Sequence, residues 1–248
     1  MKKILILTDF TQACYESVTY GLDFCRYYGL GAEILHVNEG DDFIDDDERR
    51  RTEDLVSLYR GKMRGGVEMT VKTGDFSDVM GDVSRSGDYN MIVMGTHGRH
   101  GFQPLTGSAA ARIITLQDIP VVVVQSKRFS PVRLALLPVA DCMEQYAGEI
   151  SKMAAITSAL GADVQVVCRR GEESLADSVS QYFGRKLSVA LSVDYCKDRT
   201  FSLQAIEYGE RIGADMFLGF SHEIARPMFA PVLEQLIFNL ALIPVMCC

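Results

Sequence analysis

Short apolar runs alternate with longer segments of helical period along the chain. In the first half, runs rich in branched residues predict β-strands at 3–8, 32–38, 67–73, 90–95 and 120–125. The runs KILILT and IPVVVV lack the polar and apolar alternation of a half-exposed strand, which is typical of strands buried on both faces. Such strands separated by helical segments predict β-α-β units and a parallel sheet.

A helix is predicted directly after the first of these runs. Val18, Leu22 and Cys25 are spaced as the buried stripe of an amphipathic helix. Thr11 precedes this stripe and can cap the helix, because a threonine hydroxyl accepts a hydrogen bond from an unpaired backbone N–H of the first turn.

The second half of the chain repeats the first. Residues 4–37 align without a gap with residues 134–167, and the later strands align at a shift of about 125 residues. The second copy of the first helix is predicted to open with a capping box from Asp141 to Glu144. Its predicted buried stripe consists of Met143, Ala147, Ile150 and Ala154.

This duplication predicts two domains, residues 1–128 and 129–248. Each is long enough for a core of its own, since domains cluster near about 100 to 150 residues. The predicted fold class is α/β, with two tandem Rossmann-like domains. Each domain is expected to be a five-stranded parallel sheet with helices on both faces.

The charge and hydropathy of the chain indicate which classes of partner to expect. The net charge is −8, with 15 basic and 19 acidic residues up to Arg128 and 10 against 14 after it. Neither half has the clustered basic face that nucleic acid requires, so nucleic acid is not an expected partner. No apolar run approaches a membrane span, and Asp9 comes too early for a signal peptide, so we expect no membrane contact and a cytoplasmic location.

Other polar or reactive residues favour ordinary structural roles. The acidic segment 39–54 is interpreted as a solvated loop and helix start, because acidic side chains suit the positive end of a helix. The seven cysteines form no C-x-x-C and no zinc spacing, and predict reduced, mostly buried thiols. They are Cys14, Cys25, Cys142, Cys168, Cys196, Cys247 and Cys248.

Glycines gather directly behind the fourth predicted strand. Gly95, Gly98 and Gly101 let the backbone approach a ligand closely with its N–H groups turned inward. Gly107 and Ser108 then open a predicted helix whose unpaired N–H groups favour an anion. Together these features predict a phosphate cradle, and the alternative is a tight loop that binds nothing.

The spacing of these glycines separates the loop from two common phosphate-binding motifs. It is neither G-x-x-x-x-G-K-[ST] nor G-x-G-x-x-G, but G-x-x-G, eight residues, then G-S. With KILILTDFTQAC, AEILHV, MIVMGTHGRHG and IPVVVV, it resembles the universal stress protein family, whose nucleotide-binding members carry G-x-x-G, nine residues, then G-[ST]. The resemblance covers the whole first half and, more faintly, the second, and implies the adenine nucleotide alpha hydrolase-like type of Rossmann fold.

The resemblance implies an adenine nucleotide site in the first domain. Asp9, with Thr8 beside it, would contact the ribose, and main chain at Val37 would contact adenine. The glycine loop and the G-S step would hold the phosphates. The loop and step residues that match are Met94, Gly95, Gly98, Gly107 and Ser108. The expected ligand is ATP or another adenine nucleotide, with or without Mg²⁺.

The chain departs from the family pattern in two places. The spacer RHGFQPLT has eight residues and contains Pro104, and one missing residue shifts the loop relative to Ser108 by up to about 3.5 Å. In the second domain, Asp9 falls on Val139, Gly98 on Glu223, and the G-S step on Pro231 and Val232. We therefore expect no nucleotide in the second domain. The resemblance implies instead that it pairs with the first, with a homodimer also open.

No catalytic apparatus is visible in the sequence. His97 aligns with His222, and His36 and His100 complete the four histidines. None of the four has a neighbouring cysteine or suitably spaced carboxylates that could complete a metal site, so no metal is expected. Neither Ser108 nor Cys14 has an evident base. Arg99 and Arg112 flank the cradle and are interpreted as solvated, with phosphate contact as the alternative.

The sequence therefore predicts a stress-response protein that is a nucleotide-binding or sensor module and not an enzyme. A nucleotide-independent, pseudo-dimeric interaction scaffold is the alternative, and a slow ATPase stays open as a third hypothesis.

Overall fold

The computed structural model describes residues 3–40, 46–96, 113–115, 118–139, 146–184, 189–191, 198–221 and 231–248. The chain divides into two compact units, Met1–Pro131 and Val132–Cys248. Phe129 belongs to the first unit, where its ring packs edge-on against Tyr20 and Phe24 of the first helix at centroid distances of 5.5 and 5.9 Å.

The first unit contains the five predicted strands in the parallel order β3-β2-β1-β4-β5. Ile4–Leu7 and all of β5 are buried, which confirms the prediction of strands covered on both faces. β3 forms the edge of the sheet and is largely exposed. The bounds are β1 Lys3–Leu7, β2 Ala32–Asn38, β3 Val67–Thr73, β4 Tyr89–Gly95 and β5 Val121–Val124.

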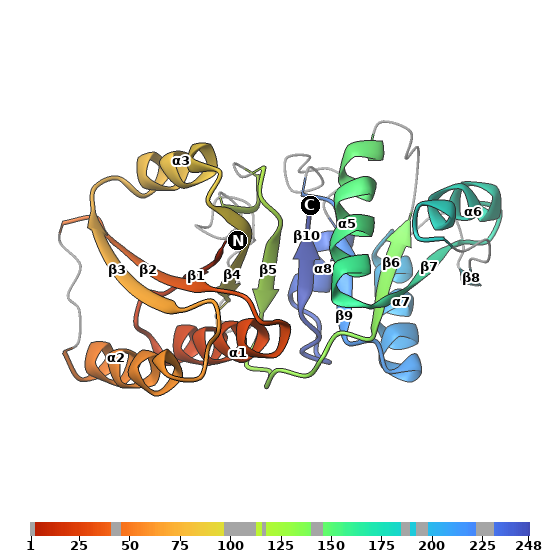
Figure 1. The fold of residues 1–248 in the computed structure, drawn as a ribbon. Helices are drawn as coiled ribbons and strands as arrows, with labels where there is room; N and C mark the ends of the chain where they lie inside the picture. Colours follow the sequence, from red (N-terminus) through yellow and green to blue (C-terminus); the bar gives the residue numbers. More distant parts are fainter. Residues whose placement is uncertain are drawn as a thin grey trace. The chain divides into compact units, whose positions relative to one another are not determined.

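Helices cover both faces of this sheet. α1 (Gln12–Tyr28) and α2 (Asp46–Arg60) lie on one face and α3 (Phe76–Ser86) on the other (Figure 1). The predicted cap is confirmed, because the Thr11 side chain accepts a hydrogen bond from the Cys14 N–H. The predicted stripe is also confirmed, since Val18, Leu22 and Cys25 are fully buried.

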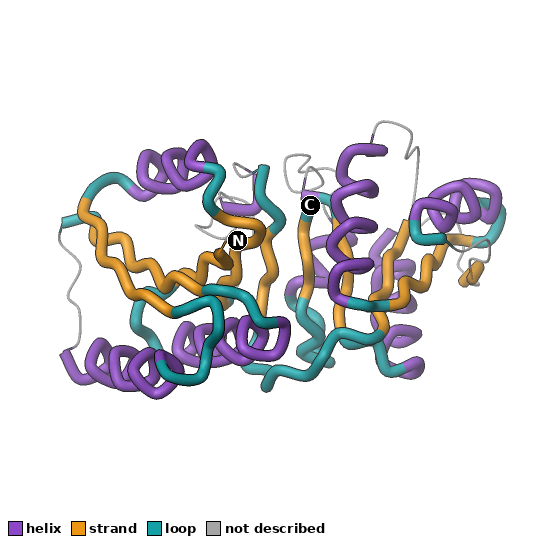
Figure 2. The backbone as a smooth tube through the Cα atoms, in the orientation of Figure 1, coloured by secondary structure: helices purple, strands orange, loops and turns teal. Residues whose placement is uncertain are grey.

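The second unit repeats this architecture in the parallel order β10-β9-β6-β7-β8. α5 lies in front of the sheet in Figure 1, and α7 and α8 lie behind it. In each unit the strands form the middle layer and the helices the outer layers (Figure 2). The bounds are β6 Leu134–Val139, α5 Ala147–Leu160, β7 Asp163–Arg169, α6 Glu173–Tyr182, β8 Val189–Leu191, α7 Asp198–Ile212, β9 Met216–Gly219, α8 Pro231–Ile237 and β10 Val245–Cys247.

The buried stripe of α5 differs from the prediction. Ile150, Met153 and Thr157 are buried, whereas Ala147 and Ala154 are only half-buried. The helix begins at Ala147 after Tyr146, whose side chain makes no capping hydrogen bond. The predicted capping box Asp141–Glu144 and Met143 lie outside the described residues.

Glycines set the distance between helix and sheet in both units. A Cβ added to Gly21 of α1 would lie 2.8 Å from Ile6 Cδ1, and one added to Gly209 of α7 would lie 2.6 Å from Phe217 Cε1. Both contacts are shorter than real Cβ atoms make, so the helices pack against their strands with no space for a methyl group.

Candidate functional site

The carboxyl ends of three neighbouring strands bring most of the predicted site residues to one edge of the first sheet. β1 pairs with β2 on one side and with β4 on the other. Thr8 and Asp9 follow β1, Val37 lies near the end of β2, and Met94 and Gly95 end β4. β1 and β4 flank the point where the strand order reverses, which is where open α/β sheets bind ligands.

Gly98, Gly107 and Ser108 of the predicted cradle lie outside the described residues, as do Gly101, Pro104 and the flanking Arg99 and Arg112. His97, His100, His222 and Glu223 are also outside them. The contribution of these residues to a phosphate site stays a prediction.

Asp9 is held at this edge by the start of α1. One carboxylate oxygen, Oδ1, accepts hydrogen bonds from the Thr11 N–H at 2.9 Å and from the Thr11 hydroxyl at 2.7 Å. Thr11 in turn caps α1, with its Oγ1 3.4 Å from the Cys14 N–H. Asp9 itself is exposed, so the fold orients a carboxylate that solvent or a ligand can reach.

The residue between Asp9 and Thr11 has an unusual backbone. Phe10 has a φ of +64°, in the left-handed region that side chains larger than glycine seldom occupy. Such a conformation costs about 1–3 kcal/mol, and the surrounding contacts must offset it. The Phe10 N–H donates to Thr8 Oγ1 at 3.0 Å, and the ring is buried. The turn from Thr8 to Thr11 is therefore fixed by side-chain hydrogen bonds and by burial.

His36 joins the ends of β1 and β2. Its Nδ1 lies 2.9 Å from the carbonyl oxygen of Thr8, and its ring packs against Phe10 with a centroid distance of 4.6 Å. The side chain is only 4% exposed. His36 is not among the predicted site residues. The signal it offered was a polar residue within the apolar run 34–37, directly before Val37.

The end of β4 adds a hydroxyl that sequence reasoning missed. Gly95 pairs with Val124 of β5, and the Thr96 N–H donates to the Val124 carbonyl at 3.2 Å. Thr96 Oγ1 is buried, and within the described part of the chain it has no hydrogen-bond partner. A buried hydroxyl without a partner is unfavourable, so this atom is available to a polar group at the sheet edge.

Cys14 has a protonated thiol. Burial and the nearby Asp9 carboxylate together raise the pKa of Cys14 to about 12. A thiol must lose its proton to act as a nucleophile, so Cys14 is unreactive at neutral pH.

The corresponding edge of the second unit is chemically different. Val139, which aligns with Asp9, is fully buried at the end of β6. α8 begins at Pro231, which aligns with the G-S step and has no N–H to donate to an anion. Among the residues described at this edge, a buried valine stands at the position of Asp9 and a proline without an N–H stands at the start of the helix.

Within the described ranges, no group of three or more histidine, cysteine, aspartate or glutamate side chains is arranged to hold a metal ion.

The described helices include none that is long and apolar enough to cross a membrane.

Parallel sheets with helices on both faces define a Rossmann-like α/β protein with two such units in one chain. The model of the universal stress protein family matches residues 1–125, and the chain belongs to this family. No curated protein matches the chain.

Solved structures show the same two-unit fold. A universal stress protein from Archaeoglobus fulgidus DSM 4304 is 16% identical with a TM-score of 0.69, and the match covers 100% of this chain and 96% of that one. A putative universal stress protein from Pseudomonas aeruginosa UCBPP-PA14 is 12% identical with a TM-score of 0.59, and the match covers 100% of this chain and 92% of that one. A functionally unknown protein from P. aeruginosa PAO1 is 13% identical with a TM-score of 0.60 and the same coverage. These likenesses confirm the predicted fold class.

Proposed function

We propose that this protein is a cytoplasmic stress-response protein that binds one adenine nucleotide, ATP or a relative of it, at the carboxyl edge of the first sheet. In this proposal it is a binding or sensor module and carries out no chemistry of its own. The second unit binds no nucleotide and has a structural role, pairing with the first.

The observation that carries this proposal is the ordered, exposed carboxylate of Asp9 beside the strand reversal. A carboxylate accepts hydrogen bonds from ribose hydroxyls, and Thr11 fixes this one in orientation. Main chain at Val37 and Met94 lies near the carboxyl ends of β2 and β4, the two strands that pair with β1, where a purine ring would be held in this proposal. The predicted glycine cradle begins at Gly95, on the same edge.

The differences between the two units support a single site. Asp9 has an apolar counterpart in Val139, and the helix that would face the phosphates begins with Pro231 in the second unit. Replacing a carboxylate by a buried valine removes the hydrogen-bond acceptor for ribose, and a proline removes one helix-start donor.

The test is a thermal shift with AMP and with ATP, each with and without Mg²⁺. A ligand at about 100 times its dissociation constant stabilises the folded state by roughly 2.7 kcal/mol, which a melting curve detects. We expect wild type to shift and Asp9→Ala not to shift, each compared with its own ligand-free melt. Asp88→Ala is the matched control, because Asp88 is an exposed acid of the same unit that precedes β4, at the opposite edge.

Two other outcomes identify the alternative functions. Absence of any shift in wild type would leave the nucleotide-independent scaffold as the better account. A shift accompanied by phosphate release from ATP that Asp9→Ala abolishes would indicate a slow ATPase.

A further inference from the structure

We propose that His36 is a positioning residue that fixes the Asp9 turn for nucleotide binding, a role that rests on the proposed function. It does so by donating a hydrogen bond from Nδ1 to the Thr8 carbonyl and by supporting the Phe10 ring. This inference extends the site to a residue that does not itself contact the nucleotide.

The tautomer of His36 follows from its partner. A carbonyl oxygen only accepts hydrogen bonds, so the Nδ1 atom 2.9 Å from Thr8 O must carry the proton. In the neutral ring Nε2 is then an acceptor, and it is buried without a partner among the described residues. The bond to Thr8 is therefore the polar contact in the described structure that sets the orientation of the ring.

The position of the bond explains its effect on Asp9. Thr8 is bonded through its carbonyl to His36 and through its hydroxyl to the Phe10 N–H. Phe10, in its left-handed conformation, packs its ring on the imidazole at 4.6 Å. Asp9 lies between these two residues, so His36 contacts the turn on both sides of the carboxylate.

The same bond couples the two strands that supply the predicted ribose and adenine contacts. Asp9 follows β1, whereas His36 lies on β2 directly before Val37. A side chain that joins Thr8 to β2 fixes the spacing between Asp9 and the Val37 main chain. A binding site needs such supports, because small displacements of its contact groups lose most of their binding energy.

Two substitutions separate the donor from simple packing. His36→Leu keeps an apolar side chain of similar bulk but removes the donor. His36→Asn is smaller, yet its amide nitrogen is attached to Cγ, as Nδ1 is, and can donate to the same carbonyl. If volume alone mattered, asparagine would be the worse substitute, whereas the positioning role predicts that it is the better one.

The first readout is AMP affinity, measured by calorimetry. We expect His36→Leu to weaken AMP binding roughly tenfold, because the Thr8 carbonyl loses its partner and the turn loosens, and His36→Asn to recover most of the loss. Equal affinities in wild type and His36→Leu, or a weaker His36→Asn than His36→Leu, would overturn the inference.

The second readout needs no nucleotide. Amide hydrogen exchange at Phe10 and Thr11 reports the turn itself, and we expect both amides to exchange faster in His36→Leu and near the wild-type rate in His36→Asn. Nitrogen-15 spectra of wild type should show a proton on His36 Nδ1. A ring without a proton on Nδ1, or an unchanged turn in His36→Leu, contradicts the role of His36. Failure of wild type to bind either AMP or ATP contradicts the proposed function and leaves this second readout to decide.

Discussion

The geometry of the candidate site depends on a few residues between β1 and α1. Thr11 serves two purposes there, since its hydroxyl caps α1 and also donates to Asp9 at 2.7 Å. Its capping role could be predicted from the sequence because an N-cap is a local feature. The contact of His36 with Thr8 could not, because the two residues are 28 positions apart in the sequence. Neither could the left-handed backbone of Phe10, because a positive φ is uncommon for phenylalanine.

Replacing Thr11 tests the capped turn. We expect Thr11→Ala to lower the free energy of unfolding by about 1 kcal/mol through loss of the cap, and also to weaken adenine nucleotide binding by loosening Asp9. Thr11→Ser keeps the hydroxyl and is the control. Urea denaturation and a nucleotide titration of the three proteins check this, and an Ala variant as stable as the Ser variant would contradict it.

At the scale of elements, strands were the most predictable part of the fold. The expected ranges 90–95 and 120–125 correspond to β4 and β5 within a residue at each end, because fully buried parallel strands have apolar runs that flanking helices do not share. The stripe of α5 was displaced, with Met153 and Thr157 buried where alanines were expected. A helix as apolar as α5 gives only a weak period to follow.

Close helix–sheet packing leads to a test with an internal control. Gly21→Ala would bring a methyl group within 2.8 Å of Ile6. We expect it to destabilise the protein by roughly 1–3 kcal/mol through overpacking.

Gly148 of α5 is helical and exposed, and a Cβ there meets nothing within 4 Å. Gly148→Ala should therefore be neutral or stabilise the protein by up to about 1 kcal/mol. Chemical denaturation of both variants measures the difference. Equal effects would show that α1 does not approach the sheet as closely as described.

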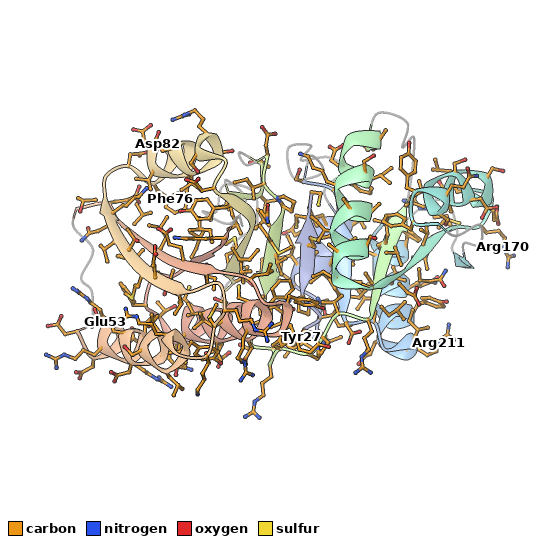
Figure 3. The ribbon with its side chains drawn as sticks, viewed as in Figure 1. Tyr27, Glu53, Phe76, Asp82, Arg170 and Arg211 are labelled. Carbon is orange, nitrogen blue, oxygen red and sulfur yellow. The ribbon has the colours of Figure 1, made fainter. Side chains whose placement is uncertain are left out.

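Side chains on the outer sides of the helices are exposed to solvent. Figure 3 shows Asp82 on the outer side of α3 and Tyr27 near the end of α1, and both are exposed. The charged residues of α2 lie in the same kind of environment, with Asp46, Asp47 and Glu48 in its first turn. Their place at the positive end of the helix agrees with the interpretation of segment 39–54 as a helix start.

On the scale of the whole molecule, the two copies of the fold differ in the residues at the carboxyl ends of their strands. Internal repetition and the fold class could be predicted from the sequence, because both depend on patterns that run the length of each unit. The predicted phosphate cradle continues into residues 97–112, which lie outside the described residues, so it stays a prediction. The loss of Asp9 and of the G-S step in the second unit was visible in the alignment of the two halves.

Because of buried thiols in both units, the free energy of unfolding should depend on pH in the alkaline range. Burial raises the pKa of Cys25 and Cys248 to about 12, from an ordinary value near 9. Above about pH 9 the unfolded chain releases these protons while the folded protein keeps them. The free energy of unfolding should therefore fall as pH rises from 9 toward 12.

Urea denaturation at pH 8, 9.5 and 10.5 tests this dependence. Cys25→Ala removes one of the thiols concerned, so its stability should decline less steeply with pH than that of wild type. Identical slopes for the two proteins would contradict the assignment to Cys25.

The most direct test of a single nucleotide site in the first unit is the number of nucleotides bound per chain. Calorimetric titration with ATP and with AMP should give one nucleotide per wild-type chain, and Asp9→Ala should lose binding at the same concentrations. Two nucleotides per chain, or a stoichiometry and affinity unchanged in Asp9→Ala, would contradict the account.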